Sequence, residues 1–249
     1  MLNGFYTIAS GMLAQQRHLG LIGNNLVNME TPGFRGERMV FTTFQHELMV
    51  RKEAYSRTPI GSASPITLVD DVITTGNSGV YRQTDHPFDL ALDGPGYLAV
   101  TGNEGQLYLT RNGQLDMDTE GYLILPGVGR VQGMDGPLQI RDAGFTVLPD
   151  GTVNSSAGRR LGTLRVVSPP ADTRLTHLSN GMYQLPDGTE PETAVGFQLL
   201  QGTRESSNVD YNREMASFIE AQRAFQSCSS ALQIIDNMNR RSAGQIAAV

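Results

Sequence analysis

The sequence predicts an α+β fold in which long N- and C-terminal helices pair as a coiled coil, with a central antiparallel β-rich domain. Apolar residues near both ends recur at alternating steps of three and four, as they do in a coiled-coil seam. Dipeptides that end in glycine mark turns through the middle of the chain. The 249 residues, 39% hydrophobic and 18% charged, fit one or two ordinary globular domains.

The first predicted helix lies within residues 1–35. Its seam contains Phe5, Ile8, Met12, Gln15, Leu19, Ile22, Leu26 and Met29, of which only Gln15 is polar. This seam is narrower than the apolar stripe of a helix that lies on a globular core. Glycines within the helix weaken it, at about 1 kcal/mol each relative to alanine. The helix therefore needs partners, and the small glycine positions let other helices approach closely.

Three asparagines stand where this helix is expected to end. Asn24 and Asn28 are four residues apart and share a helix face, with Asn25 beside them. Thr31-Pro32-Gly33 then stops the helix, because proline disfavours helical backbone in the residue before it. One amide is enough to cap a helix end. The spare amides suit hydrogen bonds to another helix or to the backbone of another subunit.

The second predicted helix, within residues 205–249, repeats the same steps. Its seam contains Phe218, Ala221, Phe225, Cys228, Leu232 and Ile235. Spacing alone also allows two amphipathic helices packed on a neighbouring domain, but matching narrow seams at opposite ends favour pairing with each other or with other copies. The predicted assembly interface contains Phe5, Ile8, Met12, Leu19, Ile22, Asn24, Asn25, Leu26, Asn28, Phe218, Ala221, Phe225, Cys228, Leu232 and Ile235.

The middle of the chain, residues 81–204, is the predicted β domain. Its turn signals are Asp93-Gly94, Asn112-Gly113, Asp135-Gly136, Asp150-Gly151 and Asp187-Gly188. Short alternating or apolar runs lie between them, which is typical of an antiparallel sandwich or barrel. Residues 36–80 are predicted as an extended connector, although Phe41, Phe44 and Leu48 also have a spacing that a helix allows.

Charge and cysteine usage exclude several classes of function. The net charge is −6, and the acidity is concentrated in the middle of the chain, so no basic face is available for nucleic acid. Cys228 is the only cysteine, which excludes an intramolecular disulfide and a multi-cysteine metal site. No stretch approaches the roughly 20 apolar residues that span a bilayer. The N-terminus has no pattern of a secretory signal peptide.

No pattern points to catalysis, to a cofactor or to a metal. Residues 94–99 fit a dinucleotide-binding pattern, but the sequence after them continues as a strand rather than a helix. Residues 116–121 imitate the start of a calcium loop, yet the twelfth position is Gly127 instead of glutamate, so a hairpin turn is favoured. His18, His46, His86 and His177 are scattered. We therefore expect no catalytic, cofactor-binding or metal site, and no small-molecule substrate.

Motifs at both ends resemble those of a known family. The run from Tyr6 to Gln16, followed by Asn24 to Arg35 (NNLVNMETPGFR), resembles the N-terminal signature of the bacterial flagellar rod and hook proteins. Glu205 to Asp210 (ESSNVD) and Glu220 to Phe225 (EAQRAF) resemble the C-terminal signature of the same family. Residues 87–97 and 108–113 are similar to its β domain.

The resemblance implies an axial protein whose terminal helices form a staggered coiled coil lining a tube. It implies a structural subunit of the flagellar basal-body rod, of the distal-rod or a closely related kind, which polymerises into the shaft that transmits motor torque to the hook and filament. The implied partners are copies of itself, other rod and hook subunits, and the flagellar type III apparatus that exports it without cleavage. The alternative is an envelope enzyme or peptidoglycan-binding module that attaches to the rod through similar ends.

Overall fold

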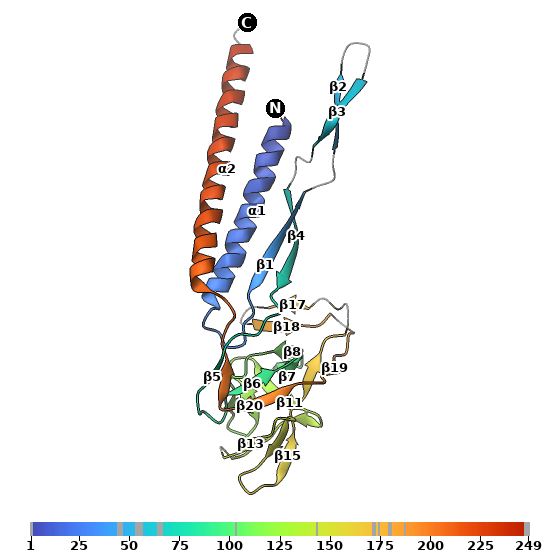
Figure 1. Cartoon of the computed structure of the whole chain (residues 1–249), viewed down its shortest axis with the longest axis vertical. Helices are drawn as coiled ribbons and strands as arrows, with labels where there is room; N and C mark the ends of the chain where they lie inside the picture. Colours follow the sequence, from blue (N-terminus) through green and yellow to red (C-terminus); the bar gives the residue numbers. More distant parts are fainter. Residues whose placement is uncertain are drawn as a thin grey trace. The chain divides into compact units, whose positions relative to one another are not determined.

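The computed structural model describes residues 2–43, 47–52, 57–63, 67–102, 104–142, 144–170, 173, 175–178, 181–186 and 188–246 (Figure 1). The chain divides into two compact units, each built from separate stretches of sequence. The first, here the helical unit, contains residues 1–27, 37–75 and 210–249. The second, here the β unit, contains residues 28–36 and 76–209. The chain therefore passes from one unit to the other at four points, after residues 27, 36, 75 and 209.

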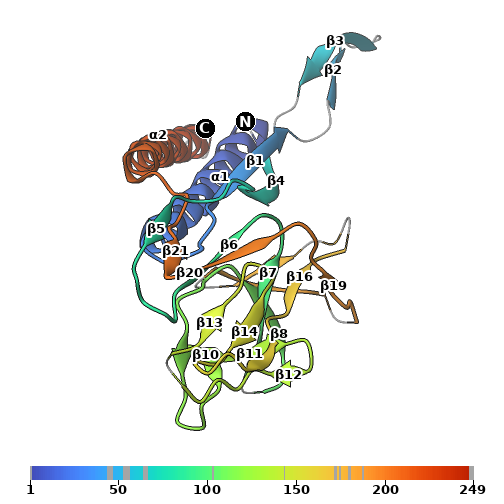
Figure 2. The ribbon, with the colours of Figure 1, turned by 60° about the horizontal axis from the view of Figure 1, so that its bottom comes forward.

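Two long helices lie side by side in the helical unit (Figures 1 and 2). They are α1, Leu2–Val27, and α2, Tyr211–Ile246. Asp210 caps the start of α2, because its Oδ1 accepts the backbone N–H groups of Asn212 (2.9 Å) and Arg213 (3.3 Å). The two terminal helices that the seams predict are thus confirmed.

A β-ribbon completes the helical unit. β1, Glu37–Thr43, pairs antiparallel with β4, Thr67–Thr74, and β2, Glu47–Lys52, pairs antiparallel with β3, Arg57–Ala63. The segment predicted as an extended connector therefore contains four paired strands. Phe41 and Leu48 lie in strands rather than in the alternative helix, and Phe44 is outside the described residues.

The β unit is antiparallel throughout its described strand pairs. Its main sheet has the order β17-β18-β8-β7-β11-β10-β9, with β12 on β11, β16 on β7 and β19 on β16 (Figure 2). A three-stranded sheet, β13-β14-β15, and the pairs β20-β6 and β21-β5 complete it. The strands are β5 Tyr81–Gln83, β6 Leu90–Asp93, β7 Tyr97–Gly102, β8 Leu107–Thr110, β9 Asp116–Met117, β10 Leu123–Leu125, β11 Gly129–Gly133, β12 Gly136–Pro137, β13 Thr146–Val147, β14 Thr152–Asn154, β15 Arg160–Thr163, β16 Val166–Ser168, β17 Thr176–His177, β18 Met182–Gln184, β19 Glu192–Thr193, β20 Gln198–Gln201 and β21 Thr203–Glu205. The predicted central antiparallel β-rich domain is confirmed.

The hydrophobic core of the β unit comes from the inward faces of these strands. Its main cluster includes Leu98, Val100, Leu123, Val131 and Val153, all at most 1% exposed. A smaller cluster lies on the opposite face of β7 and β8, around Ala99, Leu109 and Tyr183. Side chains alternate between faces along a strand, so Leu98 and Val100 enter the first cluster and Ala99 the second.

Glycine turns connect the strands where the sequence placed them. Gly94 and Gly151 have φ of 102° and 87°, a region that side-chain-bearing residues rarely adopt. Of the residues that fit a dinucleotide pattern, 94–96 join β6 to β7 and 97–99 lie in β7, so a strand follows the glycines as expected. The calcium-like run forms the hairpin β9-β10, and Asp118 Oδ1 accepts the backbone N–H groups of Glu120 and Tyr122 at its turn. Asp187, from the last turn signal, lies outside the described residues.

Candidate assembly interface

The predicted seams are only partly covered in the single chain. In α1, Ile22 is buried at 1% exposure, whereas Phe5 is 43% exposed. In α2, Ala221 is buried. The remaining apolar seam residues of the prediction are half-buried: Ile8, Met12, Leu19, Leu26, Phe218, Phe225, Cys228, Leu232 and Ile235. The chain therefore brings the two predicted seams to one helix pair and leaves apolar surface on them.

The two helices lie close together where Gly11 of α1 faces Cys228 of α2. A Cβ placed on Gly11 would lie 3.9 Å from Cys228 Sγ, which is ordinary van der Waals contact. Cys228 is half-buried and has no disulfide. A small residue in α1 thus faces the thiol, as the glycine positions in the sequence suggested.

A second apolar stripe runs along α1, and the sequence analysis missed it. Tyr6, Leu13 and Val27 are 58%, 50% and 80% exposed, and Gly20 fills the same seven-residue spacing. Seven residues turn an α-helix by almost two full turns, so these four positions share one face. The heptad interval was visible in the sequence, but Gly20 interrupts the apolar side chains. The stripe is a candidate surface for another subunit.

The predicted asparagines have distinct environments. Asn25 is 1% exposed, and its amide pairs with the backbone of Glu37: Nδ2 donates to the carbonyl (2.8 Å) and Oδ1 accepts the N–H (3.0 Å). Its Nδ2 also donates to Glu214 Oε2 at 3.4 Å, so Asn25 links α1, β1 and α2 within the helical unit. Asn24 is half-buried.

Asn28 begins the turn that follows α1. Its backbone carbonyl accepts the Thr31 N–H (3.1 Å), and its Oδ1 accepts the Thr31 hydroxyl (3.2 Å). Asn28 is 6% exposed. The residue therefore holds a local turn of the β unit that follows α1, whereas sequence reasoning expected one of the three amides to cap the helix end.

His18 lies inside the helical unit against the β-ribbon. Its ring meets the Phe41 ring edge-on, with centroids 5.4 Å apart. Burial lowers the pKa of His18, while the carboxylates of Glu214 and Glu220 act in the opposite direction. The folded chain therefore favours the neutral imidazole more than the unfolded chain does.

The two signature segments meet inside the β unit. Gly33 N–H donates to the Glu205 carbonyl (2.9 Å), and Gly36 N–H donates to Asn208 Oδ1 (2.8 Å). Gly33 has φ 68°, and a Cβ there would lie 2.3 Å from the Arg111 backbone. Only glycine fits at this position. Gly33 thus does more than end a helix, because it allows the N-terminal signature to lie directly on the β domain.

A buried cluster of charged side chains holds these segments together. It contains Arg35, Glu205 and Arg111 and is called the Arg–Glu–Arg cluster here. Glu205 is 2% exposed and lies between Arg111 (Nη1 to Oε2, 3.4 Å) and Arg35 (Nη2 to Oε1, 3.9 Å). Arg111 also donates to the carbonyls of Leu92 (3.1 Å) and Gly94, and Arg35 donates to Ser78 Oγ (3.3 Å). Gly79 N–H donates to Glu205 Oε1 at 3.2 Å. Two guanidinium groups thus share one buried carboxylate.

Sequence reasoning missed this cluster, although all three of its members stand in segments that it quoted. Arg35 ends the N-terminal signature and Glu205 begins the C-terminal one. The available signal was that Arg35 is the one basic residue of Asn24 to Arg35, while Glu205 is an acidic residue of the other motif. Arg111 offered no comparable signal, because its partner lies 94 positions further along the chain.

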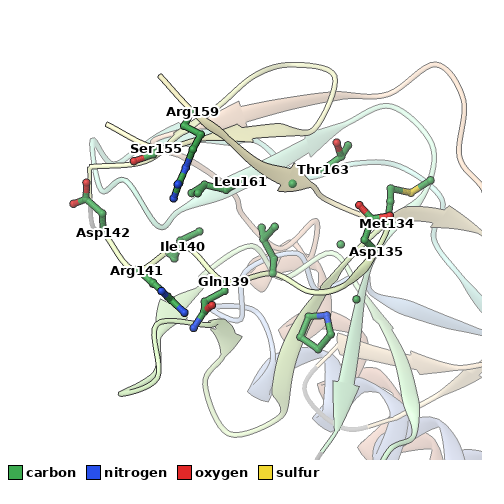
Figure 3. Close-up of a pocket in the computed structure, with 15 residues that line it drawn as sticks. Met134, Asp135, Gln139, Ile140, Arg141, Asp142, Ser155, Arg159, Leu161 and Thr163 are labelled. Atoms are coloured by element: carbon green, nitrogen blue, oxygen red, sulfur yellow. The ribbon is translucent and has the colours of Figure 1, made fainter. Parts of the chain in front are cut away.

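Among the described residues, no group of three or more histidine, cysteine, aspartate and glutamate side chains is placed to hold a metal ion. None of the described helices combines the length and apolarity needed to cross a membrane. His46 lies outside the described residues. A hollow of about 460 Å³ lies in the β unit beside β12 and β15 (Figure 3).

Comparison with known proteins gives consistent matches. Residues 5–35 match the family model described as "Flagella basal body rod protein", and residues 200–245 match "Flagellar basal body rod FlgEFG protein C-terminal". Residues 91–181 match "Flagellar hook protein FlgE/F/G D1 domain". The signature segments and the β domain thus match three descriptions of related proteins.

Whole-chain similarity extends across nearly all of the sequence. The chain is 30% identical over 247 residues to the flagellar basal-body rod protein FlgF of Caulobacter vibrioides, covering 96% of both chains. It is 29% identical to the rod protein FlgG of Bacillus subtilis, with 96% of this chain and 97% of that relative covered. It is also 29% identical to FlgG of Caulobacter vibrioides, over 93% of this chain and 95% of that relative.

Proposed function

The chain belongs to the flagellar basal-body rod protein family, and on this premise we propose that it is a structural subunit of the rod. The observation that carries the proposal is the 30% identity to a rod protein along 96% of both chains. The subunit polymerises into the shaft that transmits motor torque to the hook and filament. Its location is the flagellar basal body.

Assembly proceeds through the helical unit. The half-buried seams of α1 and α2, together with the exposed stripe of Tyr6, Leu13 and Val27, support this proposal. A single chain leaves apolar surface in water. Covering that surface with another copy stabilises the assembly by about 25 cal/mol per Å². The two helices pair as a coiled coil within the chain, and neighbouring subunits complete the seams.

The partners are copies of this chain and the other axial proteins of the rod and hook. The chain reaches them through the flagellar type III export apparatus, unfolded and uncleaved. Family membership supports both statements. The enzyme or peptidoglycan-binding alternative has no supporting observation, because the three relatives compared above, which cover 93–96% of this chain, are named as rod proteins.

The test is to delete the gene from the parent bacterium and image purified basal bodies. We expect assembly to stop before the hook, and the complementing protein to be found by mass spectrometry in purified basal bodies. The stage at which assembly stops separates an FlgF-type from an FlgG-type subunit. Complete basal bodies in the deletion strain, with normal swimming, would overturn the proposal.

A further inference from the structure

The hollow beside β12 and β15 has a mostly polar lining that includes two arginines. Leu138, Ile140 and Leu161 supply apolar side chains, and Arg141 and Arg159 stand near one another at one end (Figure 3). Within the described part of the chain, neither guanidinium has an ion-pair or hydrogen-bond partner. Two cations without counter-ions in a mostly polar hollow suit a partner that brings carboxylates.

Backbone geometry fixes one of these arginines in place. Arg141 has φ 54°, in the left-handed region that costs a residue with a side chain of order 1–3 kcal/mol. Its N–H donates to the Gly121 carbonyl at 3.2 Å, which holds this conformation. Two acidic residues also line the hollow. Asp142 is already engaged by the Ser156 hydroxyl and the Gly144 N–H, and Asp135 lies beside Met134, away from the arginines (Figure 3).

A segment with the complementary chemistry lies elsewhere on the β unit. Residues 188–196 contain Glu190 and Glu192, both exposed, and no basic residue. Neither glutamate has an ion-pair partner within the described residues. Val195 in the same segment is 84% exposed. β19 holds the segment on the sheet through the pairing of Glu192 with Ser168 and of Thr193 with Val167.

We propose that the hollow of one copy receives residues 190–195 of the next copy of this chain. Arg141 and Arg159 pair with Glu190 and Glu192, and Val195 packs on the smaller, apolar part of the lining. This inference rests on the proposed function, because it names the contact that a rod subunit makes through its β unit. Charge complementarity selects the occupant, since unpaired acidic and basic groups of one protein attract each other between copies.

The geometry of the two patches fits an open polymer. The hollow and the 190–195 segment are different surfaces of the same unit, and β19 lies apart from β15 in Figure 1 and from β12 in Figure 2. A contact between two different patches is heterologous, so each copy keeps one free patch of each kind. Such contacts build rings or helices, and a rod requires the helical case.

The test is charge reversal with rescue in a strain lacking the chromosomal gene. R141E/R159E and E190R/E192R are each expected to lower the amount of subunit in purified basal bodies several-fold, at unchanged secreted levels. The four-residue swap restores the attraction between copies and is expected to return incorporation to within twofold of wild type. All four positions are exposed, so the reversals leave the fold of the β unit intact.

A matched control separates specific pairing from net charge. E104R/D116R reverses two exposed acidic residues outside the segment and changes the net charge by the same amount as E190R/E192R. It should assemble normally and should not rescue R141E/R159E. The inference is overturned if either reversal assembles normally, or if the full swap gives no rescue. In both cases, incorporation of the wild-type protein still supports the proposed function. Absence of the wild-type protein from basal bodies would overturn both.

Discussion

Glu205 is one carboxylate shared by two buried guanidinium groups in the Arg–Glu–Arg cluster. Replacing it by glutamine leaves Arg35 and Arg111 buried without a counter-ion. Removing one partner of a buried ion pair costs about 3–5 kcal/mol. We therefore expect E205Q to lower the free energy of unfolding of the β unit by that amount, measured by urea denaturation followed by circular dichroism.

The control for this prediction is E104Q, because Glu104 is exposed and makes only a surface hydrogen bond with Gln106 (2.9 Å). A surface change of this kind should stay within about 0.5 kcal/mol of wild type. Equal urea midpoints for E205Q and E104Q would show that the cluster contributes nothing beyond its hydrogen bonds.

His18 makes the stability of the helical unit depend on pH. Burial lowers its pKa in the folded chain below the ordinary 6.5, so the unfolded chain takes up the proton first as pH falls. The stabilisation is complete above about pH 6.5 and is lost as pH falls below it towards the lowered pKa. Between pH 7.5 and pH 5, the melting temperature should fall less for H18Q than for wild type. An identical decrease in both proteins would contradict this assignment.

At the scale of elements, α1 presents a partly covered seam and an exposed stripe. Leu13 lies on the stripe and is 50% exposed, so L13D should leave the monomer as helical and as stable as wild type. In the rod the same aspartate would be buried among apolar side chains at a cost of several kcal/mol per subunit. We expect secreted, folded L13D that fails to enter basal bodies. The comparison is Q16D, also exposed on α1 but off the stripe, which should assemble normally.

The elements differ in how far sequence could predict them. Both helices followed from apolar steps of three and four, and the β domain followed from its glycine turns, because these signals depend on residues close in sequence. The ribbon β1–β4 was missed because its strands have no clean alternation: β1 reads ERMVFTT, and its pairing shifts between Val40 and Phe41. A single bulge moves the following side chains to the other face.

The candidate interface was predictable to a similar degree. The positions of the seam residues on α1 and α2 followed from spacing, whereas the exposed stripe and the Arg–Glu–Arg cluster did not. Asn25 shows why. Its amide pairs with the backbone of Glu37 at 2.8 and 3.0 Å, twelve residues away, and no local pattern encodes such a partner. The amides were expected to bond to another helix or to the backbone of another subunit, and the Asn25 amide bonds within the chain to β1 and to α2.

On the scale of the whole molecule, the β unit is assembled from two stretches of sequence. β21 and the residues after it supply Glu205 and Asn208, which hold the segment 33–36. A chain that ends after residue 209 keeps these contacts and should retain a folded β unit. A chain that ends after residue 202 loses them and should show no cooperative unfolding of that unit. Circular dichroism during urea denaturation separates the two, and equal stability would contradict the prediction.

The four passages of the chain between its units have a mechanical consequence. A subunit of a rotating shaft carries load from one unit to the other through covalent backbone at residues 27–28, 36–37, 75–76 and 209–210. Four peptide connections in parallel divide a pulling force that a single linker would bear alone. A break in one of them, by a protease for example, would leave three intact. Because the sequence crosses between the units four times, the four connections share the tension, and cutting one of them leaves the units joined.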